Sequence, residues 1–154
     1  MKKIEEKTKE YTLEEKLKYP IPYKWKIQSV KGDKAQCVAY IDARDVMDLL
    51  DRAIGIENWR DSYYRDHDRL VCKLELRVNG EWIAKEDVGT ESAFESEKGE
   101  YSDAFKRAAV KWGIGRFLYD LEIKWVLVNE KSQPIDKSGN RIYNLTDHFA
   151  KEGR

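Results

Sequence analysis

The sequence has few of the residues from which disulfide frameworks and metal centres are built. It contains two cysteines and two histidines in 154 residues, with no CxxC motif and no cluster of Cys and His. Cys37 and Cys72 both lie in apolar, strand-like runs, which favours reduced, buried thiols over a disulfide. His67 and His148 stand alone, so no metal site and no other cofactor are expected.

Long apolar runs and an excess of charge of one sign are also missing. The longest apolar runs span only a few residues, so the sequence indicates neither a signal peptide nor a membrane-spanning segment, and no membrane partner. A cytoplasmic location is the default expectation. Because 29 basic residues balance 29 acidic ones, any nucleic-acid site must come from local segregation of charge.

What the chain does have is a high content of charged and aromatic residues. Hydrophobic residues make up 41% and charged residues 38%, which is typical of a soluble globular domain with a core of its own. Five Trp and nine Tyr are many for this length. Most of these rings are expected in a core or an interface, and a few exposed ones are able to stack on bases.

The N-terminal part predicts a short helix followed by a β-hairpin. Thr12-x-x-Glu15 is a capping box that opens the helix, and two prolines then stop it. Alternation of apolar and polar residues predicts strands over residues 23–30 and 35–40, with a turn between them. Residues 1–19 are therefore taken as an N-terminal arm and short helix.

A helix with one apolar stripe follows the hairpin. Asp42 stands where it can cap this helix, and Gly55 stands where a C-terminal glycine belongs. The apolar positions recur at helical spacing, at Val46, Leu49, Leu50, Ala53 and Ile54. This spacing predicts a helix with one buried face.

Three antiparallel strands come next, over about residues 58–65, 70–78 and 82–89. The last two strands are joined at Asn79-Gly80, and this loop is compatible with two registers. The register matters because a shift of one residue moves every side chain of a strand to the other face of the sheet.

A three-residue loop gives both faces of this hairpin a consistent pattern. It pairs Val78 with Trp82 on the apolar face and sets opposite charges against each other on the outer face: Lys73 with Asp87 and Glu75 with Lys85. A two-residue turn would pair Val78 with Glu81 instead. The sequence therefore favours the three-residue loop, and Trp82, like Trp59 and Trp112, is expected in the core.

The remaining elements are a connection, a long helix, a strand and a tail. Residues 90–100 form an acidic, Ser-rich and mobile connection. A long helix is expected over about residues 100–119, and residues 124–128 predict one more strand. Residues 129–154 form a loop-rich tail, which leaves residues 20–128 as the functional domain.

The long helix distributes apolar and basic residues unevenly. One face is apolar along its whole length, at Tyr101, Ala104, Phe105, Ala108, Trp112 and Tyr119. The opposite side carries charge in its first half, at Asp103, Lys106, Arg107 and Lys111. In its second half that side is apolar, at Val110, Ile114, Phe117 and Leu118. We expect the apolar half to meet another layer or a neighbouring subunit and the basic half to lie at the mouth of a groove.

Charge is segregated around this helix. Residues 86–100 carry six acids against one base, whereas residues 101–118 carry four bases against one acid. Lys and Arg bind phosphates without reading base sequence, so such a helix suits a nucleic-acid backbone. A solvated helix face paired with the acidic stretch would have the same composition. Charge alone therefore leaves both interpretations open.

Four motifs occur along the chain in a fixed order. They are Tyr40-Ile41-Asp42-Ala43-Arg44-Asp45-Val46, Gly55-x-x-Asn58-Trp59, Glu86-Asp87-Val88-Gly89 and Asp103-Ala104-Phe105-Lys106-Arg107-Ala108-x-x-x-Trp112-Gly113. Together, and over about residues 25–121, they resemble the Rad52 family of single-strand annealing proteins. The resemblance points to the short bacterial and phage members of that family, the DdrA-like annealing proteins.

The resemblance implies an α+β fold with a β-β-β-α core, in which an antiparallel three-stranded sheet packs on a long helix after a preceding helix and an N-terminal β-hairpin. It also implies a homo-oligomeric ring with single-stranded DNA in a positively charged groove and its bases exposed for pairing. The implied function is binding of single-stranded DNA and annealing of complementary strands in homologous recombination and DNA repair, without catalysis. A recombinase or a single-strand DNA-binding protein is the kind of protein partner that this function involves.

The resemblance also carries over candidate DNA-binding residues. Lys106 and Arg107 match the Lys-Arg pair that lines the groove in the family. Arg44 is the candidate for an arginine at the start of the first core helix, and Lys111 stands one residue after the position of a further arginine. No residue is expected to be catalytic or to bind a metal.

Two other hypotheses compete with this one. Helix–strand–strand–strand–helix is also the order in double-stranded RNA-binding domains, but these place a Lys-rich cluster where this chain has Glu100-Tyr101-Ser102-Asp103. A small hydrolase would have to use Asp66-His67-Asp68 or Glu86-Asp87. No motif places a nucleophile, and adjacent acids on a strand point to opposite faces. Single-stranded DNA is therefore the preferred ligand.

Overall fold

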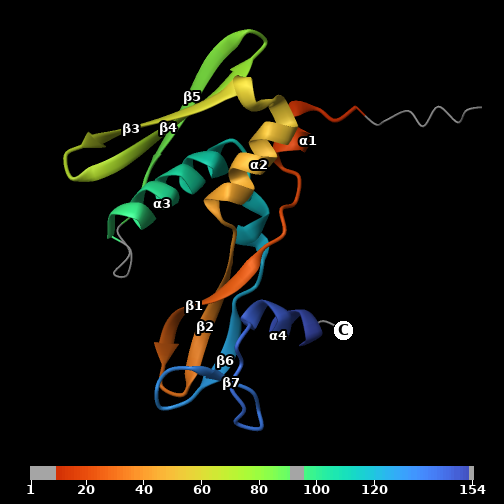
Figure 1. The fold of residues 1–154 in the computed structure, drawn as a ribbon, viewed down its shortest axis with the longest axis vertical. Coiled ribbons are helices and arrows are strands. Elements are labelled where there is room, and N and C mark those ends of the chain that lie inside the picture. The colour runs from red at the N-terminus through yellow and green to blue at the C-terminus, as the bar shows by residue number, and fades with distance from the viewer. Residues whose placement is uncertain (1–9, 91–95, 153–154) are drawn as a thin grey trace, which may run out of the picture. The chain divides into compact units, whose positions relative to one another are not determined.

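The computed structural model of the chain describes residues 10–90 and 96–152. The chain divides into two compact units (Figure 1). The first, which we call the α3 unit, comprises Met1–Pro20 and Ala43–Gly115; the second, the α4 unit, comprises Ile21–Asp42 and Arg116–Arg154. Helices and antiparallel sheets occur in both units, which confirms the predicted α+β class.

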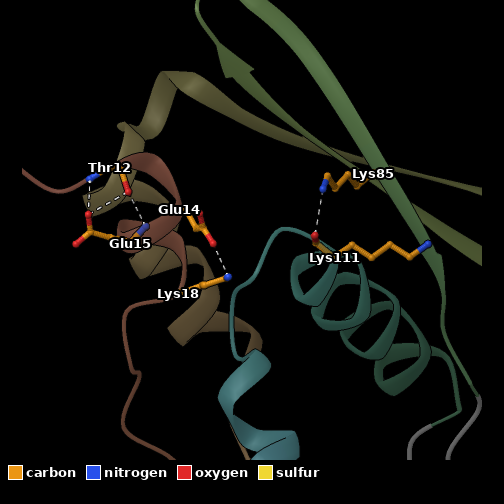
Figure 2. Close-up of polar contacts among 6 residues, drawn as sticks. All are labelled: Thr12, Glu14, Glu15, Lys18, Lys85 and Lys111. Carbon is orange, nitrogen blue, oxygen red and sulfur yellow. Dashed lines mark hydrogen bonds and ion pairs between the residues drawn. The ribbon is translucent and has the colours of Figure 1, made fainter.

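The α3 unit begins with two helices that form where the sequence signals place them. α1 spans Leu13–Leu17, and the predicted capping box is present, with the Glu15 N–H donating to Thr12 Oγ1 at 3.2 Å (Figure 2). α2 spans Ala43–Ile54. It buries the predicted apolar stripe through Val46, Leu49 and Leu50.

The three-stranded sheet of this unit consists of β3 (Trp59–Asp66), β4 (Arg69–Val78) and β5 (Glu81–Val88), all antiparallel. The register expected for the β4–β5 hairpin is wrong. Val78 pairs with Glu81, so the connecting turn has two residues rather than three. Both turn residues are left-handed, Asn79 with φ of 51° and Gly80 with φ of 80°. A two-residue turn with this backbone matches the twist of the two strands, and Asn-Gly adopts the backbone readily. This preference of the turn outweighs the charge pairing that favoured the longer loop.

The corrected register exchanges the two faces of β5. Trp82 lies opposite Arg77 on the outer face, is 36% exposed and stacks against the Arg60 guanidinium, 4.1 Å from the ring centroid. Its predicted place in the core is therefore wrong. Lys85 lies opposite Leu74, on the face that packs against the following helix.

The other two tryptophans of this unit pack against the core as expected. Trp59 is half-buried, packs on Phe105 with ring centroids 6.0 Å apart and donates a hydrogen bond to Asp51 at 2.7 Å. Trp112 is also half-buried and donates to the Leu74 carbonyl at 3.2 Å. Each indole N–H therefore has a partner, as partly buried tryptophans require.

α3 spans Ser96–Lys111, so the long helix begins and ends earlier than predicted. At its end Gly113 has φ of 101°, its N–H donates to the Val110 carbonyl, and the Ile114 N–H donates to the Ala109 carbonyl. This is the hydrogen-bond pattern of a glycine-terminated helix, and it stops α3 before residue 119 although the apolar periodicity continues. The predicted mobile connection includes residues 91–95, which lie outside the described residues.

The residues beyond α3 also depart from the predicted helix. Arg116–Asp120 form a short 3₁₀ turn, and Tyr119 within it is 71% exposed. Tyr119 is therefore not part of the buried face of α3.

The α4 unit is a four-stranded antiparallel sheet in the order β1-β2-β6-β7. Its strands are β1 (Lys24–Lys31), β2 (Lys34–Tyr40), β6 (Lys124–Val128) and β7 (Pro134–Ile135). The predicted hairpin and the predicted strand over 124–128 are confirmed. The core lies on one face of this sheet and consists of Ala35, Cys37, Val126, Val128 and Phe149.

The tail of the chain is more ordered than expected. It contains β7 and a further helix, α4 (Leu145–Glu152), whose Phe149 is buried in the core of the sheet. The Asn144 side chain accepts the Asp147 N–H at 3.0 Å and so caps the helix. An eight-residue helix carries too little periodic sequence to stand out beforehand.

Among the helices that the structure describes, none is long and apolar enough to cross a membrane.

Candidate nucleic-acid interface

α3 is fixed to the sheet of its unit by a small-residue and aromatic face. Ala104, Phe105 and Ala108 are fully buried, and the helix contacts β4 and β5. The end of β5 runs directly against α3, because a Cβ at Gly89 would overlap with the carbonyl oxygen of Glu100. The predicted buried face is thus confirmed at its centre, and the opposite side of the helix is the one that carries charge.

Arg107 lies on this charged side and is exposed. Its Nε donates to Asp103 Oδ2 at 2.9 Å, one helical turn earlier. The same carboxylate oxygen accepts the N–H of Thr90 at 2.9 Å and the Thr90 hydroxyl at 3.1 Å. Burial raises the pKa of Asp103, but the hydrogen bonds from Thr90 and Arg107 outweigh it, and the pKa lies below its ordinary value. The ionised Asp103 therefore holds the Arg107 guanidinium in one orientation.

Lys106 and Lys111 lie on the same helix. Lys106 is half-buried, and Lys111 is the last residue of α3 and is exposed. The Lys111 amine donates to the backbone carbonyl of Glu86 on β5. Three of the four predicted DNA-binding residues, Lys106, Arg107 and Lys111, thus lie on α3.

A further cation, Lys85 of β5, contacts the last residue of α3. The Lys85 amine donates to the Lys111 carbonyl at 3.2 Å (Figure 2) and lies 4.8 Å from the centroid of the Trp112 ring. The sequence reasoning missed Lys85 because the wrong register placed it on the outer face. The Asn79-Gly80 dipeptide was the signal that would have found it. We call Lys85, Lys106, Arg107 and Lys111 the α3 basic cluster.

Two acids near the start of α3 are neutralised within the unit. Glu100 is only 3% exposed and forms an ion pair with Arg65 at 3.0 Å, and Asp103 is held as described above. The helix itself begins at Ser96, one turn before Glu100. The run Glu100–Asp103, where a double-stranded RNA-binding domain would have a Lys-rich cluster, therefore lies within the helix and not at its start, and both of its acids are paired.

Arg44 lies apart from the cluster along the chain, in the first turn of α2. It is exposed, and in the part of the chain that the structure describes it forms no ion pair with Asp48, which the helical spacing had suggested. The Asp48 carbonyl instead accepts from Arg52 Nε at 3.3 Å. The structure therefore places Arg44 at the surface, and within residues 10–90 and 96–152 no hydrogen bond or ion pair links it to the α3 basic cluster.

The residues weighed for acid–base or metal chemistry do not converge on a pocket. His67 is exposed at the β3–β4 turn, with Nδ1 2.9 Å from Asp66. Glu86 and Asp87 pair with Lys73 and Cys72 respectively, and so point to opposite faces of β5. Among the described residues no group of three or more His, Cys, Asp and Glu side chains is arranged to hold a metal ion.

Comparisons with known proteins show what the chain is similar to. Residues 75–137, which include the whole α3 basic cluster, match the family model described as Rad52/22 family double-strand break repair protein. No solved structure matches the chain.

Two curated relatives match as well, and both are named single-stranded DNA-binding protein DdrA. The protein from Deinococcus deserti is 33% identical over 149 residues, which cover 92% of this chain and 74% of the relative. The protein from Deinococcus radiodurans is 32% identical over 120 residues, which cover 73% of this chain and 57% of the relative. Since the similarity to the first relative extends over most of both chains, this chain belongs to the Rad52/22 family of double-strand break repair proteins.

Proposed function

We propose that the chain binds single-stranded DNA through its phosphate backbone and anneals complementary strands in recombination and repair. The family and the names of the two DdrA relatives support this function. The observation that carries it at the level of residues is the α3 basic cluster, on a helix whose nearby acids Glu100 and Asp103 are already paired.

The chemistry of the cluster suits annealing. A strand that is to pair with a partner must be held by its backbone while the base edges stay accessible. Lys and Arg side chains bind phosphates and release condensed counterions without contacting base edges. In this proposal Lys106 and Arg107 form the main phosphate contacts. Lys111, Lys85 and Arg44, which lies on α2, add further phosphate contacts.

A ring of identical subunits would turn this small cluster into a continuous track. The chain has no net charge, so one copy has little general attraction for a polyanion. Repetition of the cluster around a ring multiplies weak phosphate contacts into stable binding. In this proposal residues 20–128 form the annealing domain, with β3, β4, β5 and α3 as its β-β-β-α core, and a recombinase or single-strand DNA-binding protein acts on the same strand.

Binding of labelled oligothymidine, duplex DNA and duplex RNA, measured by fluorescence anisotropy across a salt series, tests this function. We expect preference for the single strand and an affinity that falls as salt rises. Lys106→Ala with Arg107→Ala should weaken binding on the order of a hundredfold, because hydrogen bonds to charged groups contribute about 1.5–3 kcal/mol each. Annealing of complementary strands should be lost in parallel.

Lys31→Ala with Lys34→Ala is the matched control. This exposed basic pair lies where β1 turns into β2, away from the α3 basic cluster in the chain, and its removal should change affinity little. Preference for duplex RNA, or equal losses in the two double variants, would contradict the proposed site. A particle of about one subunit mass by light scattering would contradict the ring.

A further inference from the structure

The α4 unit contains an open groove beside the edge strand of its sheet. The groove has a volume of about 550 Å³, within the range of ligand-binding clefts. One wall is formed by residues 24–27 of β1, with Tyr40 from the end of β2, and the other by residues 141–147. We call it the Tyr143 groove, after an exposed residue of the second wall.

Two of the cations that line the groove lie beside tyrosine rings. The Lys26 amine lies 4.9 Å from the centroid of the Tyr40 ring, and the Arg141 guanidinium lies 5.1 Å from that of Tyr143. Lys24 also lines the groove and is bonded to Asp42 at 2.9 Å. Against these three bases, the lining residues include one acid, Asp147. The groove is therefore positive in charge and aromatic in character.

The second wall is held firmly by hydrogen bonds and by the core. The Ile142 N–H donates to the Pro134 carbonyl at 2.9 Å, and the Trp25 N–H of the first wall donates to Thr146 Oγ1 at 3.0 Å. Ile142 and Leu145 pack against the core of the sheet. Residues 141–147 are therefore already ordered before a ligand binds, so binding costs little conformational entropy in this wall.

Tyr143 contributes almost nothing to the fold by burial. It is 87% exposed, more than any other large hydrophobic residue in the described part of the chain. Arg141 lies on one side of its ring, and this degree of exposure leaves the other side to solvent. A large exposed aromatic ring backed by a cation, in a basic groove, is the arrangement on which single-stranded nucleic acids stack a base.

We propose that the Tyr143 groove is a base-stacking contact for single-stranded DNA, in which an unpaired base lies on the Tyr143 ring while Lys26 and Arg141 bind the flanking phosphates. The inference rests on the proposed binding of single-stranded DNA and adds a contact to it in the other unit of the chain. An acidic peptide would satisfy the same cations. It would leave the exposed ring without a partner, whereas a single strand supplies both charge and a flat ring at each nucleotide.

Photo-cross-linking of the full chain to oligonucleotides that carry 5-iodouracil tests this contact directly. Irradiation joins that base to an aromatic side chain on which it stacks, and peptide mapping by mass spectrometry locates the cross-link. We expect a cross-link at Tyr143. In anisotropy measurements Tyr143→Ala should weaken oligothymidine binding about tenfold, in line with one stacked base, and Tyr143→Phe should restore most of it.

Matched variants separate stacking from charge and from damage to the fold. Tyr119→Ala removes another exposed tyrosine of the same unit, outside the residues that line the groove, and should bind like the unchanged protein. Lys26→Ala with Arg141→Ala should lower the slope of log affinity against log salt by about one to one and a half, as expected for two phosphate contacts. Thermal unfolding of Tyr143→Ala should match that of the unchanged protein.

The outcomes distinguish this inference from the proposed function. Unchanged affinity in Tyr143→Ala, together with no cross-link at Tyr143, overturns the groove, while loss of binding in Lys106→Ala with Arg107→Ala leaves the function standing. Absence of salt-dependent single-strand binding in the unchanged protein overturns both. If a labelled poly-glutamate peptide binds in a Tyr143-dependent way and DNA does not cross-link there, the groove takes an acidic peptide and the inference is wrong.

Discussion

The two units of the chain share a plan but differ in what they present to solvent. Each has an antiparallel sheet with a helix packed on one face and a fully buried, free cysteine in its core, Cys72 in the α3 unit and Cys37 in the α4 unit. Of the four residues of the α3 basic cluster, three lie on the helix, and Asp103 forms an ion pair with one of them, Arg107. In the Tyr143 groove, Lys26 lies on the edge strand beside Tyr40, and Arg141 lies in a loop beside Tyr143.

In the two proposals, one chain without net charge holds a single strand in two ways. Contacts to phosphates alone leave the bases available for pairing, whereas stacking on tyrosine occupies a base. Annealing requires free bases, so the α3 basic cluster suits the surface where strands pair. The Tyr143 groove suits a place where a strand is retained.

The largest effects are expected when the core of one unit is emptied. Phe105→Ala removes a fully buried ring from the α3 unit, and Phe149→Ala removes a buried ring from the α4 unit. Each should lower the free energy of unfolding by about 3–5 kcal/mol, as for other buried phenylalanines. Because each phenylalanine lies in the core of its own unit, each change should open that unit in particular.

The buried cysteines report which unit opens. Burial raises the pKa of the Cys72 thiol to about 12 and also raises that of Cys37, so both react slowly with thiol reagents while folded. Labelling followed by mass spectrometry should show faster reaction of Cys72 in Phe105→Ala and of Cys37 in Phe149→Ala. Equal acceleration of both thiols in either variant would mean that the units open together.

A smaller but more local effect is expected at Gly89. Alanine there would overlap with the Glu100 carbonyl and crowd Ala104, so the start of α3 must move. We expect a loss of about 1–3 kcal/mol of stability, typical of overpacking. Because Thr90 bonds to Asp103, and Asp103 in turn holds Arg107, single-strand affinity should fall as well. Chemical denaturation and anisotropy measure the two effects, and unchanged values for both would show that α3 tolerates displacement here.

The elements of both units were largely predictable from local sequence, and their exact ends and register were not. The stripe of α2 and the buried positions Ala104, Phe105 and Ala108 follow from helical spacing, which depends only on neighbouring residues. Two sequence signals disagreed on the β4–β5 register: the charge pattern favoured a three-residue loop, and the Asn-Gly dipeptide favoured a two-residue turn. The positive φ angles of Asn79 and Gly80 decided it, and with it the location of Lys85.

The end of α3 and the existence of α4 show a second limit. Apolar residues continue at helical spacing beyond Gly113, but Phe117 packs on Tyr23 in the α4 unit, with ring centroids 6.0 Å apart. The spacing of apolar residues along the chain does not reveal whether a residue packs in the α3 unit or in the α4 unit. The Tyr143 groove was missed for the same reason, since β1 and residues 141–147 are brought together only by the folded sheet.

Asp103→Asn should change pH dependence and binding to a modest extent. The pKa of Asp103 in the folded protein lies below its ordinary value of 3.8, so the ionised carboxylate stabilises the fold at neutral pH. That contribution is lost as pH falls from 3.8 through the folded pKa. Asparagine keeps an oxygen for Thr90 and Arg107 but has no charge to lose, so acid unfolding of the variant should depend less steeply on pH.

The same substitution removes a negative charge beside the α3 basic cluster. Single-strand affinity at low salt should therefore rise about two- to threefold, an effect of the size expected for one partly screened charge. Asp68→Asn, at the exposed β3–β4 turn, is the matched control and should change neither property. Weaker binding in Asp103→Asn would show that the charge of Asp103, and not its oxygen alone, is needed to orient Arg107.

The smallest effect is expected at Arg44, because among the described residues no hydrogen bond or ion pair links it to the α3 basic cluster. If it adds one exposed phosphate contact, Arg44→Ala should weaken oligothymidine binding about two- to threefold and lower the salt slope by about 0.7. Arg52→Ala, an exposed arginine in the last turn of the same helix, is the matched control. Equal behaviour of the two variants would remove Arg44 from the DNA path. A loss comparable to that of Lys106→Ala with Arg107→Ala would instead mean that the main phosphate track extends onto α2, so that the α3 helix is only one part of the surface on which strands are held.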